Sequence, residues 1–195
     1  MLNDLTSPLT HLLSRRTAKA KDMVAPGPSD DEMRTILTAA MRTPDHGKLA
    51  PWRFVIVGAD QRDAFNTMLQ CAARSEVARD AKTDIAAVTQ FAMQAPALVV
   101  ALSTPQSSHK IPLWEQQLSA GAACMNLAHA AHALGYGACW LTGWPAYSAD
   151  VAAAFGAQGE DRIAGFIFIG TPGREIEERP RPDYDAVVRK WEPSA

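Results

Sequence analysis

The stretch from residue 41 to residue 54 reads Met-Arg-Thr-Pro-Asp-His-Gly-Lys-Leu-Ala-Pro-Trp-Arg-Phe. It predicts the end of a helix, then a polar loop, then the start of a buried strand. Pro44 ends the helix because its ring keeps the preceding residue out of the helical region, and Pro51 favours an extended exit. Charged and polar side chains gather around this loop, namely Arg42, Asp45, His46, Lys48 and Arg53. An anion-binding loop and a solvated surface turn both explain this stretch when it is taken alone.

Helix and strand patterns follow each other irregularly on either side of the loop. Helices are expected over residues 5–15, 29–42, 80–91, 114–134 and 148–155, with a further helix capped by Asp60. The helix after Ser29 also has Glu32 in position for a capping box. Apolar strands are expected over residues 54–57, 97–102, 138–142 and 163–169. This order predicts an α+β fold, with a central, mostly antiparallel sheet flanked by helices.

Composition indicates one ordinary globular domain over residues 1–195. The chain has 47% hydrophobic and 21% charged residues and a formal net charge of −2, which argues against nucleic-acid binding. Residues 171–195 are rich in proline and charge, and they predict an extended C-terminal tail. Three cysteines without paired spacing, and a start that lacks a signal-peptide pattern, predict a cytoplasmic protein with reduced thiols.

No charged residue lies between Glu115 and Asp150, which raises the question of a membrane span. Polar side chains interrupt the run, and much of the rest is alanine and glycine, so a central helix enclosed by other elements explains it better. His129 and His132 lie three residues apart on this helix, but no carboxylate is near them in sequence. We therefore predict no metal site, and we interpret Cys124 as a packing residue. The Gly135-Tyr136-Gly137 turn follows a helix, which argues against a Rossmann domain.

Several short motifs follow one another along the chain. They are Arg15-Arg16-Thr17-Ala18-Lys19, Arg42-Thr43-Pro44-Asp45-His46, Pro51-Trp52-Arg53-Phe54, Ile111-Pro112-Leu113-Trp114-Glu115-Gln116, Ser119-Ala120-Gly121, Gly165-Phe166 and Gly170-Thr171-Pro172. In this order and spacing the chain resembles the FMN-dependent nitroreductase family, most closely its small YdjA-like NAD(P)H nitroreductases. The resemblance covers nearly the whole chain up to Pro172.

The resemblance implies an intertwined homodimer with FMN bound at the subunit interface. Arg15, Arg16 and Thr17 would hold the phosphate and ribityl chain, and Lys19 would lie near the pyrimidine edge of the flavin. Further FMN contacts would come from Arg42 and His46 of the partner subunit and from Trp140, Leu141 and Thr142. A weaker dinucleotide contact would involve His132, Leu134 and Gly135.

The expected function is an NAD(P)H oxidoreductase that passes hydride through FMN to an electron-poor acceptor such as a nitroaromatic or quinone. No side chain need act as a catalytic acid or base, because the flavin carries the chemistry. A flavin-binding sensor or carrier without turnover, and a flavin-dependent dehydrogenase of a small metabolite, remain alternatives. Lys48, Ala50 and Leu141 depart from residues frequent in the family, so flavin potential and substrate preference can differ at these positions.

Overall fold

The computed structural model describes residues 2–77 and 84–193. It contains two compact units, which are described separately below. The larger unit is Thr17–Arg174, and the smaller unit combines Met1–Arg16 with Glu175–Ala195.

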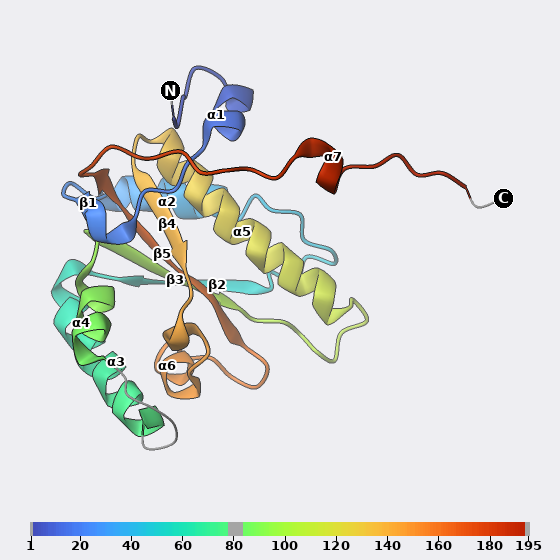
Figure 1. Cartoon of the computed structure of the whole chain (residues 1–195). Coiled ribbons are helices and arrows are strands. Elements are labelled where there is room, and N and C mark those ends of the chain that lie inside the picture. Colours follow the sequence, from blue (N-terminus) through green and yellow to red (C-terminus); the bar gives the residue numbers. More distant parts are fainter. Residues whose placement is uncertain (1, 78–83, 194–195) are drawn as a thin grey trace. The chain divides into compact units, whose positions relative to one another are not determined.

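A five-stranded antiparallel sheet forms the centre of the larger unit (Figure 1). Its strands are β1 (Met23–Val24), β2 (Trp52–Val57), β3 (Ala97–Ser103), β4 (Gly137–Leu141) and β5 (Arg162–Pro172). The order is β1-β5-β3-β2, and β4 also pairs with β5. The long strand β5 therefore contacts three others, whereas β2 pairs with β3 alone, from Trp52 opposite Ser103 to Val57 opposite Leu98. The predicted α+β class with an antiparallel sheet is confirmed.

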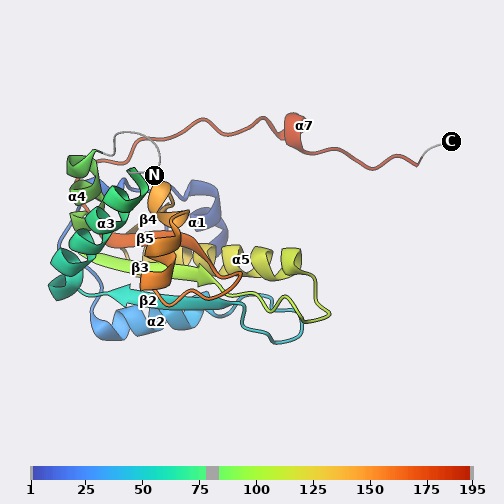
Figure 2. The ribbon, with the colours of Figure 1, turned by 90° about the horizontal axis from the view of Figure 1, so that it is seen from below.

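Helices cover both faces of this sheet because successive side chains of a strand point to opposite sides. On one face, α2 (Asp30–Ala40) and α5 (Leu113–Ala133) pack on Ile167 and Ile169 of β5. On the other face, Phe166 and Phe168 contact aromatic rings from α3 (Arg62–Val77), from α4 (Ile85–Met93) and from the residue after α6 (Ala149–Ala154). Figure 2 shows the sheet between these two helical layers.

Most helix starts agree with the sequence, and one does not. The Ser29–Glu32 capping box is present at α2, and Ser148 caps α6 through Val151 N. Asp60 was expected to cap a helix, but it lies inside the short 3-10 turn η2 (Ala59–Gln61), and α3 begins only at Arg62. The helix expected over residues 80–91 is observed as α4, capped by Asp84, and residues 80–83 lie outside the described part of the chain. The remaining 3-10 turns are η1 (Ala20–Asp22) and η3 (Trp144–Ala146).

Helix α5, which carries no charged residue after Glu115, is only half enclosed, contrary to the expectation of a helix enclosed by other elements. One face is buried among the core residues of α2 and the sheet. The opposite face leaves Trp114 67% and Leu118 53% exposed, and the exposed Ala122 continues the same stripe. None of the helices in the described residues has the length and apolar character needed to cross a bilayer.

A buried arginine joins α3 to the end of α4. Arg62 donates hydrogen bonds from Nη1 to Ala92 O at 2.7 Å and from Nη2 to Ala95 O at 3.0 Å, and its guanidinium lies 5.8 Å from the centre of the Phe168 ring. Burial lowers the pKa of Arg62 to about 10. The carbonyls at the end of α4, which have no partner within their own helix, are satisfied in this way.

The smaller unit contains α1 (Pro8–Ser14) and α7 (Tyr184–Val187). Ser7 caps α1, where the sequence pattern had suggested a helix over residues 5–15. Large apolar side chains of this unit are exposed, among them Leu9, Leu13, Tyr184 and Trp191.

The loop between α2 and β2 contains three residues in the left-handed backbone region. Gly47 has φ of 81°, Lys48 of 56° and Ala50 of 46°. Asp45 holds this conformation, because its carboxylate accepts hydrogen bonds from Leu49 N at 3.0 Å and from Ala50 N at 2.8 Å. Glycine adopts such angles freely, whereas a side chain with a Cβ atom is strained there.

Replacement of Ala50 by glycine is expected to stabilise the protein. Glycine removes the strain of the left-handed backbone, which stabilises the folded state, but it also raises the conformational entropy of the unfolded chain, which opposes folding. We expect the first effect to be larger, for a net gain of about 0.5–1 kcal/mol in the free energy of unfolding. Urea denaturation of the variant and the wild type would measure this difference in the free energy of unfolding. The matched control is Ala39→Gly inside α2, which should cost about as much as Ala50→Gly gains. A loss of stability in Ala50→Gly would show that position 50 is not strained.

Candidate functional site

Polar side chains of α5 hold the loop between α2 and β2. Ser119 Oγ donates to Pro44 O at 2.6 Å, and Asn126 Nδ2 donates to Thr43 Oγ1 at 2.8 Å and to Arg42 O at 3.3 Å. At the first turn of α5, Glu115 Oε2 lies 2.7 Å from Nδ1 of His46. The helix thus contacts two backbone carbonyls of the loop and two of its side chains, those of Thr43 and His46.

This attachment was missed from the sequence, although a signal for it was present. Positions 115, 119 and 126 are spaced by four and seven residues, so they share one side of a helix. A polar stripe on a helix that is otherwise alanine and apolar indicates a polar partner. The sequence alone does not say which loop supplies that partner.

The segment from Gln106 to Ile111 supports the loop from its other side. The buried side chain of Gln116 accepts from Gln106 N at 2.8 Å and donates to Ile111 O at 2.9 Å. Gln106 Nε2 in turn donates to Leu49 O at 3.3 Å. The backbone that carries His46 is therefore connected by hydrogen bonds to buried groups, which limits its freedom to move.

Two of the loop's expected ligand donors are placed differently from each other. Arg42 is exposed at the end of α2. Arg53, by contrast, points its guanidinium at the segment before β5, where Nη2 lies 3.3 Å from Asp161 Oδ2 and Nη1 donates to Gly156 O at 3.4 Å. Arg53 therefore has a carboxylate partner of its own, whereas no such pair is seen for Arg42 among the described residues.

The segment Thr17–Lys19 lies beside β4. A Cβ atom on Gly137 of β4 would stand only 3.0 Å from Ala18 Cβ, so the two backbones approach closely. Ala20 N hydrogen-bonds to the thiol of Cys139, whose pKa is nevertheless raised by burial. Thr17 is half-buried and Lys19 exposed. The larger unit therefore brings Thr17 and Lys19 near β4, which contains Trp140 and Leu141 and is followed by Thr142.

Trp140 is locked on the surface of the sheet. Its Nε1 donates to Ala164 O at 3.0 Å, and a Cβ atom on Gly165 would overlap the indole ring. The ring forms one wall of a cavity of about 350 Å³, which Gly121 and Gln117 of α5 and the first residues of β5 also line. Leu141 and Thr142 follow Trp140 as half-buried residues. Gly165 is thus required for the position of the tryptophan.

The smaller unit gathers three guanidinium groups. Arg181 Nη2 donates to the backbone O of Arg15 at 3.2 Å, and Arg16 Nε lies 3.9 Å from Glu178 Oε1. Burial, then the charges of Arg181 and Arg16, lower the pKa of Arg15. Glu178 Oε1 also lies 3.4 Å from Arg181 Nη2, so this carboxylate is a partner of two of the three arginines, and the positive charge gathered here would attract an anion.

The residues expected to contact a dinucleotide differ in exposure. His132 is 2% exposed on the core side of α5, whereas Leu134 and Gly135 are exposed at its end. Gly135 has φ of 88°, as expected for a left-handed helix cap. A dinucleotide could reach Leu134 and Gly135 directly, but it could reach His132 only if the helix moved.

Cys124 is buried in α5, at the position interpreted from the sequence as a packing residue. Burial raises the pKa of Cys124 to about 12, so its thiolate is disfavoured. In residues 2–77 and 84–193, no three His, Cys, Asp or Glu side chains gather in a metal-binding arrangement.

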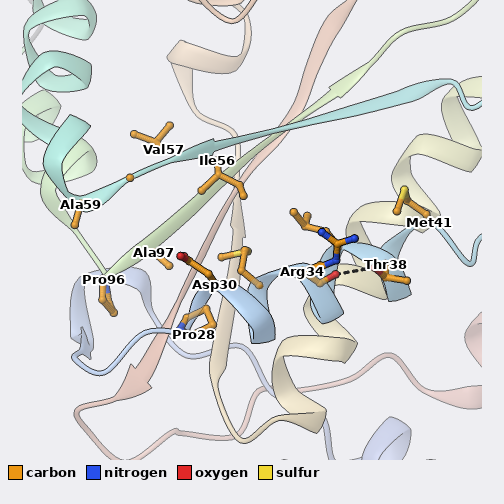
Figure 3. Close-up of a pocket in the computed structure, with 13 residues that line it drawn as sticks. Pro28, Asp30, Arg34, Thr38, Met41, Ile56, Val57, Ala59, Pro96 and Ala97 are labelled. Atoms are coloured by element: carbon orange, nitrogen blue, oxygen red, sulfur yellow. Dashed lines mark hydrogen bonds between the residues drawn. The ribbon is translucent and has the colours of Figure 1, made fainter.

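A larger groove lies away from these residues, between α2 and the edge strand β2 (Figure 3). It has a volume of about 630 Å³, and its labelled lining residues include Met41, Ile56, Val57 and Pro96. Arg34 and Thr38 of α2 stand at the same groove, with Thr38 Oγ1 bonded to Arg34 O at 2.7 Å. None of the predicted flavin-contacting residues lines it.

Comparison with known proteins identifies the family. The model of the nitroreductase family matches residues 12–171. A relative from Escherichia coli (strain K12), named "Putative NAD(P)H nitroreductase YdjA", is 35% identical over 161 residues, which cover 83% of this chain and 86% of the relative.

Solved structures show the same fold. A nitroreductase-like family protein from Bacillus cereus superposes with a TM-score of 0.81 at 18% identity, covering 96% of this chain and 97% of that one. A structure described as a "putative nitroreductase in complex with FMN", from Desulfovibrio desulfuricans, superposes with a TM-score of 0.71 at 20% identity over 96% and 99% of the two chains. Because the family model spans most of the sequence and the Escherichia coli relative matches nearly as much, the chain belongs to the nitroreductase family.

Proposed function

We propose that this protein is an FMN-dependent NAD(P)H oxidoreductase whose acceptor is an electron-poor compound such as a nitroaromatic or a quinone. Family membership, the FMN complex of the Desulfovibrio desulfuricans protein and the name of the Escherichia coli relative support the proposal. When bound, FMN would supply the hydride-transfer chemistry, and the protein would bind, orient and shield it.

The observation that carries the proposal is the guanidinium cluster of the smaller unit. Arg181 donates to the backbone of Arg15, and Glu178 is a carboxylate partner of both Arg16 and Arg181, so the three guanidinium groups lie close together, an arrangement that suits a phosphate group. We propose that Arg15, Arg16 and Thr17 bind the FMN phosphate and ribityl chain. Arg181, contributed by the tail, would assist them.

We assign the remaining contacts to residues near β4 and to the loop before β2. Lys19 would place a cation near the pyrimidine edge of the flavin, where it stabilises the negative charge of the reduced ring. Trp140, Leu141 and Thr142 would line the flavin, with the locked indole of Trp140 excluding water from one side. Arg42 and His46 would reach it from the partner subunit. The exposed Leu134 and Gly135, with His132 behind them, would contact the dinucleotide weakly.

We propose that the protein is a homodimer. The exposed apolar stripe of α5, formed by Trp114, Leu118 and Ala122, supports this assembly, because exposed apolar patches are typical of protein interfaces. No charged residue follows Glu115 on α5, so burial of the stripe would desolvate few charges. We also propose that residues 1–195 act as one domain, with residues 171–195 as a tail.

The first test is the colour and the reduction of the purified protein. We expect a yellow preparation, or one that binds added FMN, whose flavin absorbance bleaches anaerobically on addition of NADH or NADPH and returns when a quinone is added. A yellow protein that does not bleach would favour a flavin-binding sensor or carrier. A protein that refuses FMN would contradict the proposed function.

Arg15→Ala should weaken FMN binding by about ten- to a hundredfold, which corresponds to about 1.5–3 kcal/mol for one charged hydrogen bond. Titration of FMN fluorescence would measure the dissociation constant. Arg34→Ala is the matched control, because Arg34 is an exposed arginine of α2 outside the proposed site. Equal affinities for the Arg15→Ala variant and the wild type would remove Arg15 from the site.

Leu118→Glu should convert the dimer to monomers, because it places a charge in the centre of the proposed apolar interface. Size-exclusion chromatography with light scattering would follow the mass over a range of concentrations. Met93→Glu provides the control: Met93 is 48% exposed at the end of α4, in the helical layer on the other side of the sheet. A variant with Leu118→Glu that stays dimeric would place the interface elsewhere.

A further inference from the structure

The pair formed by His46 and Glu115 is a feature that the sequence did not predict. His46 Nδ1 lies 2.7 Å from Glu115 Oε2, although 69 residues separate the two in the chain. Their side chains are 65% and 45% exposed, so the hydrogen bond forms at the surface of the larger unit. An exposed pair of this kind contributes little to stability, which makes a purely structural role a weak explanation.

Both partners are held on rigid supports. Glu115 lies in the first turn of α5, where the positive end of a 21-residue helix favours a carboxylate. The loop that carries His46 is fixed on both sides of that residue. Before it, Ser119 Oγ donates to Pro44 O, and after it, Leu49 N and Ala50 N donate to the Asp45 carboxylate. Because neither backbone is free to drift, the hydrogen bond determines the rotation of the imidazole ring.

We propose that Glu115 is a positioning residue that fixes the tautomer and the orientation of His46. A carboxylate only accepts hydrogen bonds, so it selects the ring form that carries a proton on Nδ1. Nε2 is then the ring nitrogen left for a ligand, and within the described chain it makes no hydrogen bond of its own. The functional part of this inference rests on the proposed flavin site, to which His46 would belong.

The arrangement has a chemical consequence at one atom. In the neutral ring Nε2 offers a lone pair, and in the protonated ring it offers an N–H group, while Nδ1–H remains on Glu115 in both forms. His46 would therefore present to the ligand a single nitrogen that exchanges one proton. Such a group suits a flavin oxygen, or an acceptor oxygen that gains a proton as the acceptor is reduced.

The tautomer can be measured without any flavin. Nitrogen-15 NMR of histidine-labelled full-length protein, recorded at about pH 8.5 so that an ordinary imidazole is neutral, distinguishes protonation at Nδ1 from protonation at Nε2. We expect the Nδ1–H form for His46 in the wild type. Glu115→Met, which removes the acceptor, should shift His46 mainly to the Nε2–H form, whereas Glu115→Gln should retain Nδ1–H because its amide oxygen still accepts.

Asp63→Asn is the matched control. Asp63 is an exposed acidic residue in the first turn of α3, so this variant also removes a first-turn charge, but it should leave the His46 signals unchanged. If Glu115→Met leaves the tautomer of His46 as it is in the wild type, the positioning role is wrong.

A second measurement separates this inference from the proposed function. In FMN titrations, Glu115→Met and His46→Ala should each weaken binding by about three- to thirtyfold, and the double variant should be no weaker than His46→Ala alone. Additive losses in the double variant would overturn the claim that Glu115 acts through His46. A tautomer shift in Glu115→Met with unchanged FMN affinity in every variant would support the positioning of His46 and contradict its place in the flavin site.

Discussion

The structure depends on the two-sided packing of β5. This strand pairs with β1, β3 and β4, and its alternating side chains supply both halves of the core. Phe166 and Phe168 face the layer of α3, α4 and α6, while Ile167 and Ile169 face α2 and α5. Gly165, which directly precedes Phe166, has no side chain, and this leaves room for the Trp140 indole on the sheet. One strand thus determines both the core and a wall of the candidate site.

Helix α5 connects the sheet to the loop that carries His46. Its core face packs on the sheet, its polar stripe binds the loop, and its apolar stripe is exposed. The buried Gln116 links the helix to the segment around Gln106 and Ile111. These three contacts explain the composition of the helix: small residues allow close packing, while Glu115, Gln116, Ser119 and Asn126 each have a specific partner.

Local features could be predicted from the sequence, and long-range pairings could not. The capping residues Ser29 and Ser148, and the four longer strands, follow from short patterns, because caps and alternation depend on neighbouring residues. The prediction that Asp60 caps a helix was wrong, because a 3-10 turn uses the same residue types as a helix cap. The two-residue strand β1 has too short a pattern to detect. The bond between His46 and Glu115, and the diversion of Arg53 to Asp161, depend on folding that brings distant segments together.

The position of β5 near the end of the chain has a consequence for synthesis on the ribosome. Translation completes α5 at Ala133, but β5, one of the elements that cover its core face, begins only at Arg162. At ordinary elongation rates, on the order of seconds pass before β5 emerges and the sheet can close. During that interval α5 can contact α2 and β3, which are already made, but the part of its core face that packs on Ile167 and Ile169 stays uncovered. Apolar surface that is exposed in this way during folding favours aggregation.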